Sequence, residues 1–308
     1  MSKAVRFDSY GDLDVLEVRD VDRPEPGPGE VLIEVKAAGI NPGESSIRKG
    51  LLRDVFPTTF PSGQGSDFAG VVVETGSETD KFTSGDEVVG FSDERSSHAE
   101  FVVVPEGNLV PKPASLPWDV AGALYVAGTS AYAAVRYVNL KDGDVVAVAG
   151  AAGGVGSIAV QLAAEAGATV LGIAGPSNDD WLRAHGVIPV NYGDGLAERL
   201  RAAAPEGRID ALLDFFGGGY VALAVDELGV APERVNTIID FAAAEKYRVG
   251  TSGNADAANA GVLAELVARA ADGRLEVPIA ETFALDDVRT AFSTLEQRHT
   301  RGKLVLRP

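Results

Sequence analysis

The feature that most constrains this chain is a glycine-rich segment, Ala149–Gly156, between a β-branched run and a stretch with helical spacing. Val145–Ala149 predicts a strand, and Gly156–Ala166 predicts a helix. Glycines at such a junction let the chain turn tightly and approach a pyrophosphate, which the N–H groups at the helix start then face. The segment therefore predicts a dinucleotide-binding loop, although tight packing of helix on strand alone is an alternative. The candidate loop contacts are Gly150, Ala152, Gly153, Gly154, Val155 and Gly156.

The loop is a variant of the G-x-G-x-x-G fingerprint. In that register it reads Ala151-Ala152-Gly153-Gly154-Val155-Gly156, with alanine in place of the first glycine. A lone loop of this kind is a weak signal, but the strand before it and the helix after it supply the context that the fingerprint requires.

The pattern of elements changes near Pro117. Before it, short strands alternate with Gly/Pro turns, which is typical of a sandwich or barrel. After it, strands and helices alternate, which predicts an open parallel sheet covered by helices. The tail returns to strands and turns, so we expect a discontinuous first domain. The predicted domains are 1–117 with 254–308, and 118–253. The strands expected in the first domain and the tail are Ala4–Phe7, Val15–Val21, Val31–Ala37, Phe68–Glu74, Glu87–Phe91, Ala99–Val104, Leu275–Pro278, Glu281–Leu285 and Lys303–Leu306.

Composition excludes several classes of function. The formal net charge is −18 and no basic patch is visible, so nucleic acid and anionic membrane surfaces are poor partners. The chain has no cysteine, which excludes disulfides, thiolate catalysis and cysteine zinc sites, and its 3 histidines are far apart in sequence. The uncharged run Val145–Ala164 is better explained as strand, turn and buried helix than as a membrane span. The N-terminus has no apolar signal-peptide core, so we expect a cytoplasmic protein.

The end of the strand Thr169–Ala174 bears on the choice of nicotinamide cofactor. NAD binders place an acidic residue there against the ribose hydroxyls, but this chain has Gly175, with Ser177 and Asn178 able to donate to a 2′-phosphate. This favours NADPH. The carboxylates of Asp179 and Asp180 would instead repel a 2′-phosphate and disfavour NADPH. The alternative is that they only complement the dipole of a helix capped by Ser177 or Asn178.

Several motifs together resemble the medium-chain dehydrogenase/reductase superfamily, and within it the zinc-free NADPH quinone oxidoreductases. The resemblance covers nearly the whole chain. It implies an α/β fold with a GroES-like β-barrel domain and a Rossmann domain with a doubly wound parallel sheet, and usually a homodimer. The motifs are Ala38-Gly-Ile-Asn-Pro42, Phe60-Pro-Ser-Gly-Gln-Gly-Ser-Asp-Phe-Ala-Gly70, Gly128-Thr-Ser-Ala-Tyr132, the glycine loop, Val190-Asn-Tyr192 and Gly302-Lys303.

The resemblance also implies that no metal is bound. Zinc-dependent relatives carry Cys where this chain has Asn41, and Gly-His-Glu where it has Gly65-Ser66-Asp67. The four-cysteine structural-zinc loop is absent as well. Without a Lewis acid, alcohol oxidation lacks a way to stabilise an alkoxide, whereas reduction of an electrophilic acceptor needs less help.

The resemblance also implies roles for individual residues. Asn41 would form a hydrogen bond near the nicotinamide ribose or the substrate, and Thr129 would contact the nicotinamide; both are the catalytic candidates. The structural alternatives are an Asn-Pro turn for Asn41 and a helix cap for Thr129. Ser177 would meet the 2′-phosphate, and Tyr192 would lie beside the adenosine unless it is a core residue. Asp67 is better explained as a hydrogen-bond hub than as an acid catalyst. The segment expected along the nicotinamide, or else an ordinary part of the core, is Phe215, Phe216 and Gly217.

The expected activity is transfer of hydride from NADPH to a quinone or activated enone. Many relatives carry an active-site tyrosine near the place of Leu52, which is the proposed proton donor in enoyl reductases. Its absence matters less for a quinone, which can take its proton from solvent. Two alternatives stay open: an alkenal or enone C=C reductase, for which Tyr125, Tyr132 or water could supply the proton, and an NADPH-binding protein with little turnover.

Overall fold

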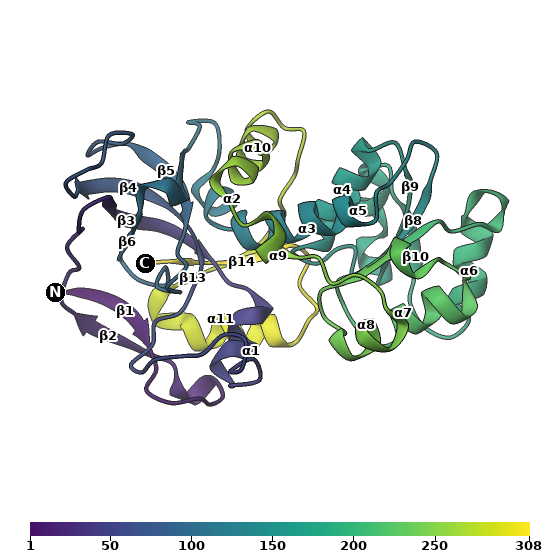
Figure 1. The fold of residues 1–308 in the computed structure, drawn as a ribbon, viewed down its shortest axis with the longest axis horizontal. Helices are drawn as coiled ribbons and strands as arrows, with labels where there is room; N and C mark the ends of the chain where they lie inside the picture. Colours follow the sequence, from purple (N-terminus) through teal and green to yellow (C-terminus); the bar gives the residue numbers. More distant parts are fainter. The chain divides into compact units, whose positions relative to one another are not determined.

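The computed structural model describes residues 1–308, and these form two compact units (Figure 1). The first unit joins Met1–Val126 to Asn259–Pro308, and the second is Ala127–Ala258. The first boundary lies inside helix α3 (Tyr125–Tyr137). Whether the chain folds in domains with the bounds expected from sequence, 1–117 with 254–308 and 118–253, stays a prediction.

The first unit is built on a mainly antiparallel sheet of seven strands. The strand order is β13-β14-β3-β4-β5-β7, with β6 paired to β3. Only β13 and β14 pair in parallel. A separate ribbon pairs β1 with β2. The strands are β1 (Ser2–Arg6), β2 (Glu17–Val21), β3 (Glu30–Gly39), β4 (Asp67–Thr75), β5 (Glu87–Phe91), β6 (Phe101–Pro105), β7 (Leu109–Pro111), β13 (Ile279–Ala284) and β14 (Lys303–Arg307).

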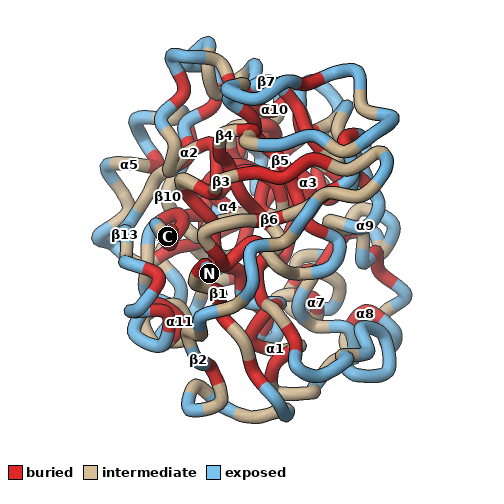
Figure 2. The backbone as a smooth tube through the Cα atoms, turned by 90° about the vertical axis from the view of Figure 1, so that its left-hand side faces the viewer, coloured by how far each residue is buried: buried red, intermediate tan, exposed pale blue.

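The tail contributes to this unit because β14 pairs with the end of β3, where Leu306 lies opposite Ala38. The central strands β3, β4 and β5 consist mostly of buried residues, drawn red in Figure 2, and their apolar side chains form one core. The helices of the unit are α1 (Pro42–Arg48), α2 (Trp118–Gly122), α10 (Ala260–Ala271) and α11 (Val288–Glu296).

Two local expectations are corrected in and beside this unit, and one helix of the unit was not expected. The helical spacing of residues 121–138 predicts one helix, but the structure forms two, because α2 ends at Gly122 and α3 begins at Tyr125. Leu275–Pro278 forms no strand; Leu275 and Val277 are buried, so their alternation reports burial rather than pairing. The amphipathic helix α11, which the sequence reading did not include, buries Phe292 against Leu304 and Leu306.

The second unit is a five-stranded parallel sheet in the order β10-β9-β8-β11-β12. The chain starts in the middle at β8, moves outward to β10, and then returns to β11 on the other side of β8. The order therefore reverses between β8 and β11, which is where open α/β sheets bind ligands. The strands are β8 (Val145–Ala149), β9 (Thr169–Ala174), β10 (Ile188–Asn191), β11 (Ala211–Asp214) and β12 (Val235–Thr237).

Helices connect these strands. A π-helical turn, Leu223–Glu227, continues α7. None of the helices of the chain is both long and apolar enough to cross a membrane. The helices are α4 (Gly156–Glu165), α5 (Asp179–Ala184), α6 (Leu196–Ala203), α7 (Tyr220–Ala222), α8 (Phe241–Tyr247) and α9 (Asn254–Ala257).

Candidate functional site

The glycine loop forms a closed turn between β8 and α4. Gly150 has a φ of +71°, a conformation that favours glycine, and its carbonyl accepts the N–H of Gly153 over 2.9 Å. A Cβ on Gly156 would lie only 2.1 Å from the Gly150 oxygen, so no side chain fits at the start of α4. These contacts explain why the loop needs glycine at both ends.

The loop also leaves backbone donors unused. The N–H groups of Ala152, Gly154 and Val155 have no acceptor within the chain, whereas that of Ala151 donates to the Ile173 carbonyl of β9 over 3.2 Å. Tight packing of helix on strand explains why residue 156 is glycine. It does not explain why three free N–H donors lie beside the start of a helix. The arrangement fits the pyrophosphate of a dinucleotide.

The residues after β9 form the second part of this edge. Gly175 precedes a short turn that exposes Ser177, and the Asn178 amide donates to the Gly175 carbonyl over 3.4 Å. Asn178 occupies the N-cap position of α5, one of the two positions expected for the cap, although its side chain accepts no N–H of the helix. The Tyr192 ring, 58% exposed, stands close by: its hydroxyl oxygen is 3.4 Å from where a Cβ on Gly175 would lie.

The two acids of α5 are engaged by neighbouring donors. Asp179 accepts hydrogen bonds from Arg183 over 3.1 Å and from the Asn191 amide over 3.1 Å. Asp180 pairs with the same Arg183 over 3.2 Å. Their charge is therefore partly neutralised within α5 and at the end of β10, which agrees with a role inside the helix rather than against a ribose.

The loop after β10 is held by Arg199, which the sequence reading passed over. Its guanidinium donates to the carbonyls of Asn191, Gly193 and Asp194 over 2.6 to 3.1 Å. No local signal marks Arg199, because a surface arginine on a helix is common. Its effect is to fix the loop that carries Tyr192.

The turn after β11 lies against the glycine loop. A Cβ on Gly150 would be 3.4 Å from the Phe216 Cβ and 3.5 Å from the Phe215 carbonyl. The Phe215 N–H donates to the Ala149 carbonyl over 3.2 Å. The structure therefore brings the glycine loop, Gly175–Asn178, Tyr192 and Phe215–Gly217 to one edge of the sheet, formed by the carboxyl ends of its strands.

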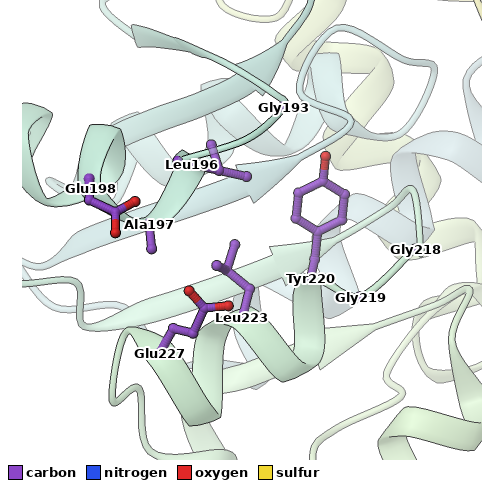
Figure 3. Close-up of a pocket in the computed structure, with 10 residues that line it drawn as sticks. Gly193, Leu196, Ala197, Glu198, Gly218, Gly219, Tyr220, Leu223 and Glu227 are labelled. Atoms are coloured by element: carbon purple, nitrogen blue, oxygen red, sulfur yellow. The ribbon is translucent and has the colours of Figure 1, made fainter.

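A cavity of about 510 Å³ lies beside this edge (Figure 3). Leu196 on α6 and Leu223 on the π-helical turn extend into it from opposite sides, and Tyr220 lines one end. Burial, with Asp214 as a smaller cause, raises the pKa of Tyr220, so the phenol is neutral. The lining residues are Gly193, Gly195, Leu196, Ala197, Glu198, Gly218, Gly219, Tyr220, Leu223 and Glu227.

Thr129 lies on α3 and is buried. Its hydroxyl oxygen accepts a hydrogen bond from the Asn254 amide over 2.7 Å. The sequence reading missed Asn254, since 125 positions separate the two residues. The threonine is thus held by a residue at the start of α9.

Asn41, in the first unit, belongs to a buried polar cluster defined by Asn41, Glu44, Asp67, His98 and Lys303. The Asn41 amide nitrogen donates to Glu44 over 3.2 Å and to Asp67 over 3.3 Å. The Lys303 ammonium donates to the Asn41 side-chain oxygen and lies 3.6 Å from Asp67. Both donors of the amide are used, so Asn41 can meet a ligand only by accepting a hydrogen bond through its oxygen.

The charges of this cluster are set by burial. Burial raises the pKa of Glu44 and that of Asp67, while Lys303 acts in the opposite direction on both carboxyls. Burial lowers the pKa of His98 to about 4, so this imidazole is neutral. The Val126 N–H and the Asn41 amide both donate to Asp67, which fits its interpretation as a hydrogen-bond hub.

Comparison with known proteins shows the family. The alcohol dehydrogenase GroES-like domain matches residues 27–114, and the zinc-binding dehydrogenase family matches residues 182–306. The quinone oxidoreductase from Coxiella burnetii has a solved structure that is 30% identical, with a TM-score of 0.89 over 100% of this chain and 99% of that chain. The chain belongs to the medium-chain dehydrogenase/reductase superfamily.

Two relatives indicate which group of the superfamily the chain resembles. A quinone oxidoreductase of Pseudomonas aeruginosa is 28% identical over 338 residues, covering 100% of both proteins. A 2-methylene-furan-3-one reductase of Solanum lycopersicum is 30% identical over 321 residues, covering 99% of this chain and 79% of that protein. The chain is therefore a quinone-oxidoreductase-like member of an oxidoreductase family. The predicted fold class, a GroES-like domain with a Rossmann parallel sheet, is confirmed.

One matched family is described as zinc-binding, and the residues of this superfamily member do not fit a zinc ion. Zinc takes Cys, His and carboxylate ligands, but Asn41 and Ser66 stand at two of the expected ligand positions. The Asn41 oxygen already accepts from the ammonium of Lys303, a cation beside Asp67. No three His, Cys, Asp or Glu side chains are arranged to hold a metal.

Proposed function

We propose that the chain is an NADPH-dependent reductase that transfers hydride to a quinone or to an activated enone without a metal ion. The observation that carries the proposal is the glycine loop, where three free N–H groups stand beside the start of α4. The Pseudomonas and Coxiella quinone oxidoreductases support the acceptor class.

The choice of NADPH rests on the residues after β9. Ser177 presents an exposed hydroxyl, and no carboxylate occupies the strand end at Gly175. The nearest acid, Asp179, is paired with Arg183 and Asn191. A 2′-phosphate at this place would therefore find the Ser177 hydroxyl as a hydrogen-bond donor. It would also face less negative charge than the two acids of α5 indicate, because Asp179 is paired.

In the proposed reaction the cofactor supplies the hydride, and the residues of the chain bind and orient. The N–H groups of the glycine loop bind the pyrophosphate. Asn41 and Thr129 are proposed to touch the nicotinamide end, Asn41 as a hydrogen-bond acceptor. A quinone that gains a hydride becomes a hydroquinone by gaining one proton, which solvent supplies, so no essential acid is required.

A second candidate is reduction of an activated C=C bond. It is favoured by the tomato relative, whose name describes reduction of a methylene-furanone. This reaction places hydride on one carbon and a proton on its neighbour, so it needs a proton donor in reach. The two candidates share the cofactor site and differ in the acceptor.

The test is the rate of NADPH oxidation with a para-benzoquinone, beside NADH and beside a simple enone, each with and without a chelator. We expect chelator-insensitive turnover of the quinone with a preference for NADPH. Faster turnover of the enone would favour the second candidate. Loss of activity in chelator, or no oxidation with either acceptor, would contradict the proposal.

A further inference from the structure

Asp214 and Thr237 join the ends of two neighbouring strands. They are the last residues of β11 and β12 and lie opposite each other in the register. The Thr237 hydroxyl donates to Asp214 Oδ2 over 2.9 Å, and both side chains are fully buried. A buried carboxylate needs several donors to offset its lost hydration, and here those donors all come from the edge described above.

The other carboxylate oxygen shapes the turn after β11. Asp214 Oδ1 accepts the N–H groups of Phe216 over 3.0 Å and of Gly217 over 2.7 Å. The residue thus fixes the backbone of the turn that packs against Gly150 of the glycine loop.

Thr237 organises the loop after β12 in the same way. Its hydroxyl oxygen accepts the N–H groups of Ile239 over 3.2 Å and of Asp240 over 3.0 Å. The two loops also pack directly, because a Cβ on Gly217 would lie 2.8 Å from the Ile239 side chain. One hydrogen bond between Asp214 and Thr237 therefore couples two loops.

We propose that Asp214 and Thr237 are positioning residues for the nicotinamide half of the cofactor, an inference that rests on the proposed function. The pyrophosphate faces the start of α4, and the adenosine half lies toward β9, so the other half extends over β11 and β12. The surface it meets there is made by the two loops that the pair holds. Neither residue touches the cofactor; the pair acts through the Phe215–Gly217 turn and the loop after β12.

The experiment measures two dissociation constants for Thr237→Val, which keeps the shape of the side chain but removes its hydroxyl. One ligand is NADPH, and the other is 2′,5′-ADP, which contains only the adenosine half. We expect about tenfold weaker binding of NADPH and unchanged binding of 2′,5′-ADP. Thr237→Ser restores the hydroxyl and with it the affinity for NADPH. Thr169→Val is the matched control. Thr169 is the first residue of β9 and so lies at the opposite edge of the sheet, and its substitution leaves both dissociation constants unchanged.

Each outcome is decisive. Equal weakening for both ligands, or no weakening for NADPH in a variant that melts like the wild type, would overturn the positioning role. If Thr237→Val does not fold, the Thr237→Ser variant decides, since NADPH affinity below the wild-type value in that folded variant contradicts the proposal. A wild-type chain that binds neither ligand would instead refute the proposed function, and this inference with it.

Discussion

The ammonium of Lys303 donates a hydrogen bond to the side-chain oxygen of Asn41. The same ammonium donates to the Ile40 carbonyl over 3.0 Å and lies 3.6 Å from Asp67. Lys303 is thus the cation that faces two buried carboxyls, Asp67 and Glu44, inside the cluster. It also fixes which atom Asn41 presents to a ligand.

Removal of this cation is expected to be costly. Lys303→Met leaves Asp67 and Glu44 buried without a counter-ion, and breaking a buried pair from one side costs about 3 to 5 kcal/mol. Urea unfolding of the variant measures the loss. The double variant Lys303→Met/Asp67→Asn removes one carboxylate as well and is expected to recover a large part of it. If the single variant unfolds at the wild-type urea concentration, the cluster does not have the electrostatic role described.

The pH dependence of stability is expected to report on His98. Burial lowers its pKa in the folded chain to about 4 from 6.5, so the unfolded chain binds the extra proton first as the pH falls. Stability from this group is therefore complete above pH 6.5 and is lost between about 6.5 and 4. The full loss is about 3 kcal/mol at about 1.4 kcal/mol per pKa unit.

The raised pKa values of Glu44 and Asp67 act in the opposite direction, because stability from these groups is present at low pH and is lost as the pH rises. A variant isolates the histidine. His98→Gln keeps an N–H donor for the Gly39 carbonyl, which lies 3.1 Å from His98 Nε2. The difference in unfolding free energy between the two proteins is expected to change between pH 6.5 and 4. A constant difference across that range would show that His98 is not buried in a neutral state.

The exposed hydroxyl of Ser177 is expected to discriminate between cofactors. Hydrogen bonds to charged groups contribute about 1.5 to 3 kcal/mol, so Ser177→Ala is expected to raise the KM for NADPH about tenfold. NADH lacks the 2′-phosphate and serves as the internal control, with its KM unchanged. Equal changes for both cofactors would show that Ser177 does not meet the phosphate.

The Rossmann elements could be predicted closely because their signals are local. Val145–Ala149 and Thr169–Ala174 have the bounds expected from the sequence, since buried β-branched runs end at glycines or small residues. Helix α11 was missed, although Val288, Ala291 and Phe292 have helical spacing, because the tail was interpreted in the strand-and-turn style of the N-terminal part.

The polar partners of the candidate site could not be predicted, because they come from distant parts of the chain. Lys303 is 262 positions from Asn41, and Asn254 is 125 positions from Thr129. Asp214 and Thr237 each look like ordinary ends of strands. Only the pairing of β11 with β12 makes them neighbours. The sequence motifs predict the residues expected to contact the cofactor. The residues that form hydrogen bonds with these site residues are identified only by the folded structure.

The proposed function depends above all on the glycine loop, which we expect to bind the NADPH that reduces the acceptor. The most direct test is quinone-dependent NADPH oxidation by the wild type and by Gly156→Val, whose first side-chain atom would lie 2.1 Å from the Gly150 oxygen. Gly107→Val is the control, because a Cβ there meets nothing within 4 Å. We predict rapid oxidation by the wild type and the control, and loss of both NADPH binding and oxidation in Gly156→Val. Normal NADPH oxidation by a folded Gly156→Val variant would contradict the account.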